Sequence, residues 1–239
     1  MKRYDTVLFD LDGTLLPMDQ DLFVKEYFKD LCAHTARRGY KPDELVKAVW
    51  RGTGAMVGND GSKTNEQAFW AEFSAVYGDK AYEDKPLFDD FYENAFDPLI
   101  RVCRPDKRPS DFIKVLKSRG IRLIIASNPI FPLTAHKKRL VWSGLDPDDF
   151  AYITSYENSA WCKPSPGYYT EIAEKNGLDP GKCLMVGNDV SEDTPAALAG
   201  MDVFIITDCL INKNNTDLGH VPHGDMDALV SYLEKTTKE

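Results

Sequence analysis

The sequence predicts an α/β protein in which helices cover both faces of a parallel β-sheet and a helical module follows the first strand. Short apolar runs alternate with segments of helical periodicity over most of the chain, an order typical of parallel sheets. Glycines follow the predicted helices beyond residue 100, where helices often end because glycine adopts positive φ without a steric cost. Residues 16–99 interrupt this alternation and contain no convincing strand.

The predicted strands are short and almost continuously apolar, as expected for strands that are buried on both faces. They comprise residues 7–9, 121–126, 152–154, 183–186 and 203–206. The predicted helices of the same region comprise residues 110–119, 132–143, 166–176 and 192–199, which are followed by Gly120, Gly144, Gly177 and Gly200. Together these elements predict a sheet-containing core formed by residues 1–15 and 100–239.

The inserted module, residues 16–99, is predicted to be helical. Its helices are indicated by an amphipathic pattern in residues 22–31, by Pro42 at a first-turn position, by a capping-box pattern at residues 64–67, and by residues 87–95.

Two features of the module are considered for a role in binding. The aromatic residues of its third helix are assigned to the core of the module rather than to a binding surface; they are Phe69, Trp70, Phe73 and Tyr77. The glycine-rich segment 51–61 is predicted to be mobile, and it is compatible with a position facing the leaving group and at least equally with a flexible connector between helices.

Composition and charge exclude several classes of partner. The chain has 239 residues, of which 43% are hydrophobic, and a net charge of -9. This acidic balance argues against nucleic-acid binding, which requires a basic surface, and no run approaches the roughly 20 apolar residues of a membrane span. The five cysteines show no CxxC spacing and no export signal is evident, so we expect free thiols and a cytoplasmic protein. The oligomeric state is left open.

Two aspartates directly follow the first predicted strand. Asp10 and Asp12 are two residues apart, so in an extended chain both carboxylates point to the same side. The carboxyl ends of strands in open parallel sheets are where ligands bind. Gly13 then permits a tight turn and a close approach of the backbone. Taken alone, the pair Asp12-Gly13 is also compatible with an ordinary turn.

A second pair of acids follows the strand at residues 183–186. Asp189 and Asp193 are four residues apart, which places them on one face of a helix, although Asp193 alone is compatible with an acid at a helix N-terminus. Four carboxylates that converge would repel one another unless a cation lies among them. Because oxygen ligands suit Mg²⁺, we expect a magnesium site formed by Asp10, Asp12, Asp189 and Asp193.

Two further segments supply groups that suit a phosphate. Ser127 and Asn128 follow the second predicted strand, and the serine hydroxyl can donate to a phosphoryl oxygen. Lys163 lies before Pro164 in a loop and supplies a positive charge. Taken alone, Ser127 is typical of a turn and Lys163 of an exposed surface. Together with the acids, they provide the donors and the charge that stabilise a transferring phosphoryl group.

In this order, the motifs resemble those of the haloacid dehalogenase superfamily. The matching residues are Phe-Asp-Leu-Asp-Gly-Thr at 9–14, Ser127, Lys163-Pro164, and Gly187-Asn188-Asp189 with Asp193. The resemblance covers roughly residues 1–15 and 100–239, and it implies a Rossmann-like core with residues 16–99 as a small α-helical cap. The chain departs from the pattern at Gly-Asn-Asp, where many members have Gly-Asp. Glu192 adjoins Asp193, and Asp193 is favoured as the metal-site acid for its spacing, with Glu192 as the alternative.

The resemblance implies a Mg²⁺-dependent phosphohydrolase that cleaves a phosphate monoester of a small metabolite through an aspartyl-phosphate intermediate. Asp10 would be the nucleophile and Asp12 the general acid and then the general base. The metal would be held by Asp10, the backbone carbonyl of Asp12, and Asp189. The implied substrate-binding residues are Gly13, Thr14, Ser127, Asn128 and Lys163.

Three alternatives stay open at this stage. The same scaffold would support a phosphomutase or a phosphonate hydrolase, the latter with a lysine from the cap such as Lys25, Lys29 or Lys63. Dehalogenases of the superfamily usually lack an acid at the position of Asp12, which favours phosphate chemistry. A phosphoacceptor signalling module is an alternative of another class, although such modules are shorter and lack the helical insert. A catalytically silent binding protein is disfavoured because all motif residues are present.

Overall fold

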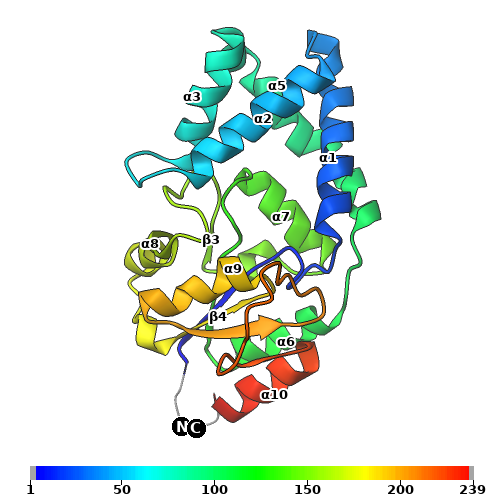
Figure 1. The fold of residues 1–239 in the computed structure, drawn as a ribbon. Coiled ribbons are helices and arrows are strands. Elements are labelled where there is room, and N and C mark those ends of the chain that lie inside the picture. Colours follow the sequence, from blue (N-terminus) through cyan, green and yellow to red (C-terminus); the bar gives the residue numbers. More distant parts are fainter. Residues whose placement is uncertain (1–3, 237–239) are drawn as a thin grey trace.

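A six-stranded parallel β-sheet lies in the lower half of the computed structural model, which describes residues 4–236 (Figure 1). Its strands are β1 (Thr6–Phe9), β2 (Arg122–Ile125), β3 (Tyr152–Ile153), β4 (Cys183–Gly187), β5 (Asp202–Ile206) and β6 (His223–Gly224). The order β3-β2-β1-β4-β5-β6 places β1 between β2 and β4, and every pairing is parallel. The predicted Rossmann-like sheet is therefore confirmed. β6 is an additional edge strand that the sequence did not indicate.

Helices cover both faces of the sheet. They are α6 (Arg108–Ser118), α7 (Leu133–Trp142), α8 (Pro166–Asn176), α9 (Val190–Asp193) and α10 (Met226–Thr236). Val7 and Phe9 of β1 join an apolar cluster with α6, α7 and α10, whereas Leu8 joins a second cluster with α8. This division follows from the alternation of side chains along a strand. Burial on both faces explains why the strands are almost continuously apolar.

The helical module forms the upper part of the molecule (Figure 1). Its helices are α1 (Gln20–Thr35), α2 (Pro42–Val57), α3 (Asn65–Tyr77), α4 (Lys80–Glu83) and α5 (Lys85–Asp90). The chain enters and leaves the module at neighbouring points, because Met18 pairs with Cys103 and the Arg104 N–H donates to the Pro17 carbonyl at 2.8 Å. The insertion of a helical cap after β1 is thus confirmed. The domain limits at residues 15/16 and 99/100 stay a prediction.

The structure corrects two details of the module. The flexible connector predicted at residues 51–61 is wrong for residues 51–57, which belong to α2. A Cβ at Gly52 would lie 2.5 Å from the ring of Phe69, so this glycine serves the close packing of α2 on α3. The helix predicted at residues 87–95 is regular only to Asp90 and continues as a π-helical turn, Phe91–Ala95. The predicted capping box at Thr64 is confirmed.

Short 3₁₀ segments complete the chain: Ala36–Arg38, Asp97–Val102, Pro147–Asp149, Pro180–Lys182 and Thr194–Ala199. The last of these follows α9 and accounts for most of the helix predicted at residues 192–199. All five cysteines are free thiols, as expected. None of the helices within residues 4–236 is both long and apolar enough to span a membrane. The cytoplasmic location stays a prediction.

Candidate active site

A cavity opens at the carboxyl edge of the sheet, where β1, β2 and β4 face the helical module. Phe9 lies opposite both Ile125 and Val186, so the segments that follow these strands leave the sheet at the same level. The cavity, which we call the sheet-edge cavity, is lined by Asp10, Asp12, Met18, Gln20, Phe23, Val24, Ser127, Asn128, Ile130, Phe131, Asn188, Asp189, Glu192 and Asp193. The two predicted pairs of carboxylates therefore converge.

Lys163 lies beneath this cavity rather than on the surface. Its side chain is fully buried, and its ammonium donates to Asp10 Oδ1 at 2.9 Å and to Asp193 Oδ1 at 2.7 Å. Burial alone would lower the pKa of Lys163, but the two carboxylates outweigh burial and raise it well above its ordinary value. Lys163 therefore stays charged and holds Asp10 in a fixed position. Thr14 Oγ1 donates to the other Asp10 oxygen at 3.2 Å.

Asp193 is almost completely buried, and both of its carboxylate oxygens are in use. Oδ1 accepts from Lys163, and Oδ2 accepts from the backbone N–H of Asp189 at 2.9 Å. A Cβ at Gly187 would lie 2.0 Å from this carboxylate, so a glycine is required for its close approach to β4. Burial raises the pKa of Asp193 to about 6. These contacts make Asp193 a support for Lys163 and for the segment after β4.

Asp189 begins α9 and presents one oxygen away from the helix. Its Oδ1 accepts from the backbone N–H groups of Ser191 and Glu192 at 2.8 and 3.1 Å. The neighbouring Glu192 also lines the cavity, and burial raises its pKa to about 7. Within residues 4–236, no three Asp, Glu, His or Cys side chains are clustered so that they alone would enclose a metal ion.

Asp12 is paired with Arg139, a residue that the sequence analysis missed. Arg139 Nη1 donates to Asp12 Oδ2, and Nη2 contacts Nδ1 of His136 at 3.1 Å. The guanidinium is fully buried and lies 4.7 Å from the centre of the Phe131 ring. Burial raises the pKa of Asp12, an effect that Arg139 opposes. The other carboxylate oxygen, Oδ1, is buried and accepts no hydrogen bond from any residue between 4 and 236.

His136 completes this buried group on α7. Burial and the adjacent Arg139 hold its pKa well below the usual range, so the ring is neutral. A neutral imidazole can accept at Nδ1 from Arg139, which orients the guanidinium toward Asp12. In the sequence, Arg139 is one of several basic residues in a helix with Lys137 and Lys138, and no local signal separates it from them.

The turn after Asp12 packs against the segment after β4. Thr14 Oγ1 also donates to Asn188 Oδ1 at 3.0 Å, and a Cβ at Gly13 would lie 2.3 Å from the Asn188 amide. Asn188 Nδ2 donates to the carbonyl of Cys209 at 2.7 Å. The asparagine that departs from the family pattern therefore joins three segments of the chain. Gly13 and Thr14 lie below the cavity and do not line it.

Ser127 and Asn128 line the cavity as predicted. The hydroxyls of Thr154 and Tyr168 each donate to the carbonyl of Ser127 at 2.7 Å and fix the backbone there. Asn128 Oδ1 accepts from the Lys163 backbone N–H, and its Nδ2 donates to Glu192, both at 3.2 Å. All predicted site residues thus lie in one place, although their roles stay predictions.

Comparison with known proteins supports the resemblance. Residues 4–200 match the model of a hydrolase family described as haloacid dehalogenase-like hydrolase. A phosphoglycolate phosphatase of Mesorhizobium japonicum is 27% identical over 98% of this chain and 93% of its own length.

Solved structures share the fold. A protein of Haemophilus somnus, described as a predicted phosphoglycolate phosphatase, matches with a TM-score of 0.60 and 20% identity over 97% of this chain and 99% of its own. The HAD-hydrolase YfnB of Bacillus subtilis, solved with magnesium bound, matches with a TM-score of 0.55 at 20% identity over 97% and 99% of the two chains. At this identity, the likeness establishes the fold alone.

Proposed function

The chain belongs to the haloacid dehalogenase-like hydrolase family, and we propose that it is a Mg²⁺-dependent phosphatase that cleaves the phosphate monoester of a small metabolite. Membership confirms the predicted family and confirms that the chain is an enzyme of phosphatase type, as its curated relatives are. The single observation that carries the proposal is the buried contact of Lys163 with Asp10, with the acid Asp12 two residues further on.

Asp10 is the proposed nucleophile. Its carboxylate is held by Lys163 and Thr14, so an oxygen attacks the phosphorus without reorientation of the side chain. The new bond joins an Asp10 oxygen to phosphorus as the bond from phosphorus to the alcohol oxygen breaks, and Asp12 gives that oxygen a proton. Water then attacks the aspartyl-phosphate, Asp12 takes the proton from the water, and phosphate leaves with Asp10 restored.

The oxygen donors at this edge fit Mg²⁺. Asp10, the backbone carbonyl of Asp12 and Asp189 are hard oxygen ligands, and Mg²⁺ binds through few protein ligands while it keeps several waters. When bound, the ion would offset the negative charge of the phosphate beside these acids. Asp193 has both oxygens engaged by Lys163 and by the Asp189 N–H, so we assign it to the support of the ligands.

Ser127 and Asn128 are the proposed phosphate-binding groups. The backbone N–H groups of Gly13 and Thr14 donate to the carbonyls of Leu16 and Leu11 at 2.9 and 3.2 Å, and neither residue lines the cavity, so we assign them to the turn after Asp12. Ser127 faces the cavity from a backbone that two hydroxyls immobilise. Lys163, which is buried beneath the cavity and bound to Asp10, adds a positive charge near the phosphate. Fixed donors and charge of this kind favour the transition state because no solvent has to reorganise around it.

The alternative reactions have less support. A dehalogenase needs no proton donor to its leaving group, whereas the acid Asp12 lies at the cavity. A phosphonate hydrolase needs a lysine at the substrate, but no lysine lines the cavity among the described residues, and Lys25, Lys29 and Lys63 are exposed. The helical cap argues against a signalling module.

Hydrolysis of para-nitrophenyl phosphate tests the proposal. We expect turnover with Mg²⁺, none with EDTA, and recovery when Mg²⁺ is added back. Asp10→Asn should lower turnover by at least about 10³-fold, because the amide is a poor nucleophile. Asp111→Asn is the matched control, since its side chain is 82% exposed and distant from the cavity.

Two results would contradict the proposal. One is full activity in EDTA. The other is activity of Asp10→Asn within about tenfold of wild type in a variant with an unchanged circular dichroism spectrum.

A further inference from the structure

A second cavity, which we call the aromatic cavity, adjoins the sheet-edge cavity on the side of the helical module. It is lined by Val24, Tyr27, Phe28, Leu31, Val49, Trp50, Thr53, Phe69, Trp70, Phe88, Asp89, Tyr92, Ile130, Phe131, Pro132 and Tyr156. Three of these residues, Val24, Ile130 and Phe131, also line the sheet-edge cavity. A substrate with its phosphate beside Asp10 would therefore extend past them into the aromatic cavity.

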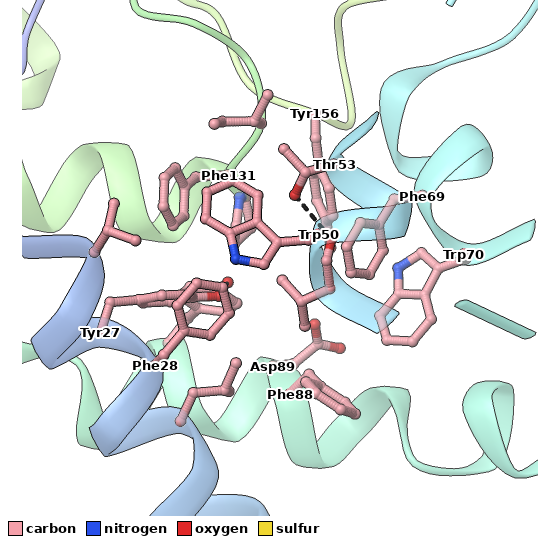
Figure 2. A pocket seen from close by; sticks show the side chains of 16 residues that line it. Tyr27, Phe28, Trp50, Thr53, Phe69, Trp70, Phe88, Asp89, Phe131 and Tyr156 are labelled. Carbon is pink, nitrogen blue, oxygen red and sulfur yellow. Dashed lines mark hydrogen bonds between the residues drawn. The ribbon is translucent and has the colours of Figure 1, made fainter. Parts of the chain in front are cut away.

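The walls of the aromatic cavity are rings from several elements. In the view of Figure 2, Trp50 is near the centre, with Tyr27 and Phe131 toward one side and Phe69 and Trp70 toward the other. The rings are packed on one another: the centroids of Phe28 and Trp50 are 5.5 Å apart, and those of Phe69 and Trp70 are 5.4 Å apart. The assignment of Phe69 and Trp70 to the module core alone is thus incomplete, because both rings also face this cavity.

Several polar groups of these walls are already paired within the chain, but the indole N–H of Trp70 is buried and donates to no residue between 4 and 236. The Thr53 hydroxyl donates to the Val49 carbonyl at 2.9 Å, and the hydroxyls of Tyr27 and Tyr92 lie 2.8 Å apart in a hydrogen bond. A ligand in the cavity therefore gains mainly from the burial of apolar surface, and the Trp70 N–H is the donor left for an uncharged acceptor on it. Trp50 remains 51% exposed, so a ligand that covers its ring removes apolar area from water.

Two cations lie behind the rings of the aromatic cavity, with Arg139 4.7 Å from the centre of the Phe131 ring and the Lys85 ammonium 5.9 Å from that of Trp70, but each is bound to an acid. Among the described residues that line the cavity, Asp89 is the one acid and none is Lys, Arg or His. Burial raises the pKa of Asp89, and the nearby ammonium of Lys85 is bound to Glu66. The Asp89 carboxylate forms no hydrogen bond or ion pair with another residue in the described part of the chain, although the charge of Lys85 partly offsets the rise in its pKa. An anionic ligand would therefore meet a carboxylate here without any paired cation.

We propose that the aromatic cavity binds the leaving group of the substrate, and that this group is apolar and carries no negative charge. This inference rests on the proposed phosphatase function and narrows its substrate class. It separates this chain from its relatives named phosphoglycolate phosphatases, because the leaving group of phosphoglycolate is short and bears a carboxylate. A cavity of rings with an acid at its edge would desolvate that carboxylate and give it no partner.

An isosteric pair of substrates tests the charge. Isobutyl phosphate and phosphoglycolate have leaving groups of the same branched shape, one ending in two methyl groups and the other in a carboxylate. We expect kcat/KM to be at least about tenfold higher for isobutyl phosphate, although glycolate is the better leaving group. 2-Phenylethyl phosphate should be better still, because its ring reaches the walls of the cavity.

Trp50→Ala tests the location. It should lower the ratio of kcat/KM for 2-phenylethyl phosphate to that for isobutyl phosphate by about tenfold, because a buried ring contact is lost. Tyr82→Ala is the matched control, since Tyr82 is another half-exposed aromatic residue of the module, at 55%, and lies outside the cavity. This control should leave the ratio unchanged.

The outcomes separate the two proposals. If wild type hydrolyses para-nitrophenyl phosphate but prefers phosphoglycolate, or if Trp50→Ala leaves the ratio unchanged, the phosphatase function stands and the inference about the leaving group is wrong. If no phosphate ester is hydrolysed with Mg²⁺, the proposed function fails and the inference fails with it.

Discussion

The two cavities that meet at Val24, Ile130 and Phe131 are built from opposite kinds of side chain. In the sheet-edge cavity, acids are held by buried cations, with Lys163 bound to Asp10 and Arg139 bound to Asp12. In the aromatic cavity, rings form the walls and no cation is present among the described lining residues. The reaction needs charges in fixed places, whereas recognition of an apolar group needs only shape and a lack of opposing charge. Substitutions at the sheet edge should therefore slow every substrate, and substitutions in the module should change which substrates are preferred.

After Asp10→Asn, Asp12→Asn should have the largest effect, and its effect on kcat/KM should depend on the leaving group. We use kcat/KM because it reports phosphoryl transfer to Asp10 and not the later attack by water, in which Asp12 is the proposed base for every substrate. With isobutyl phosphate, whose alkoxide needs a proton, we expect a loss of about 10²–10⁴-fold. With para-nitrophenyl phosphate, whose phenolate leaves without a proton, the loss should be much smaller. Steady-state kinetics with both substrates measures the difference. Equal losses would show that Asp12 acts by charge or position rather than as the general acid.

Lys163→Ala should slow all substrates to a similar extent. Removal of a fixed positive charge beside the phosphate typically lowers kcat by about 10²–10³-fold. The variant also leaves Asp10 and Asp193 buried without their cation, so the free energy of unfolding should fall by about 3–5 kcal/mol. Kinetics and urea denaturation measure the two effects.

The control for Lys163→Ala is Lys114→Ala, because the side chain of Lys114 is 69% exposed and pairs only with an exposed acid. Unchanged kinetics and stability in Lys163→Ala would contradict the burial and the contacts of this lysine.

Arg139→Gln tests a positioning residue that acts through Asp12. Loss of the guanidinium should let the Asp12 side chain move, and we expect kcat/KM for isobutyl phosphate to fall by about 10- to 100-fold. As in Asp12→Asn, para-nitrophenyl phosphate should be affected less, which a purely structural role would not explain. Arg139→Lys should recover part of the rate, and Lys137→Gln on the exposed side of α7 is the control. An equal loss with both substrates would show that Arg139 does not act by positioning Asp12.

Much of the sheet edge is predictable because its residues are placed by local geometry. Asp10 and Asp189 each follow an apolar strand, and parallel strands end at one edge, so their convergence follows from the pattern alone. Lys163 is different. Its loop is evident from the sequence, but its burial depends on two acids that lie 153 and 30 residues away in the chain. In the sequence, only the combination of Lys163 with the acids and with Ser127 indicates that it is not a surface lysine.

Features that depend on packing between distant helices were not predictable. Gly52 reads as part of a flexible segment, yet it lies in a helix because Phe69 of α3 packs against it. Arg139 reads as an exposed helical residue, yet α7 turns it toward Asp12. Likewise, the aromatic residues of α3 fit a core pattern, and only the placement of α1 and α2 leaves two of their rings facing a cavity. Periodicity identifies a helix and its apolar face. It does not show which side chains of that face pack against another helix and which line a cavity.

Asp89→Lys should have the smallest effect and would sharpen the comparison most directly, because it brings a cation to the cavity that has none. The lysine would attract the carboxylate of phosphoglycolate and remove the repulsion by Asp89. Because an ion pair near solvent contributes little energy, the new pair of lysine and carboxylate should have a small effect. We expect the ratio of kcat/KM for phosphoglycolate to that for isobutyl phosphate to rise by about two- to fivefold. The rise should disappear in about 1 M NaCl, since salt screens charges over a few ångströms. Asp79→Lys, at an exposed position of the same module outside the cavity, controls for the change in net charge. An unchanged ratio in Asp89→Lys would mean that the leaving group does not pass Asp89, and the charge of the aromatic cavity would then have no part in substrate choice.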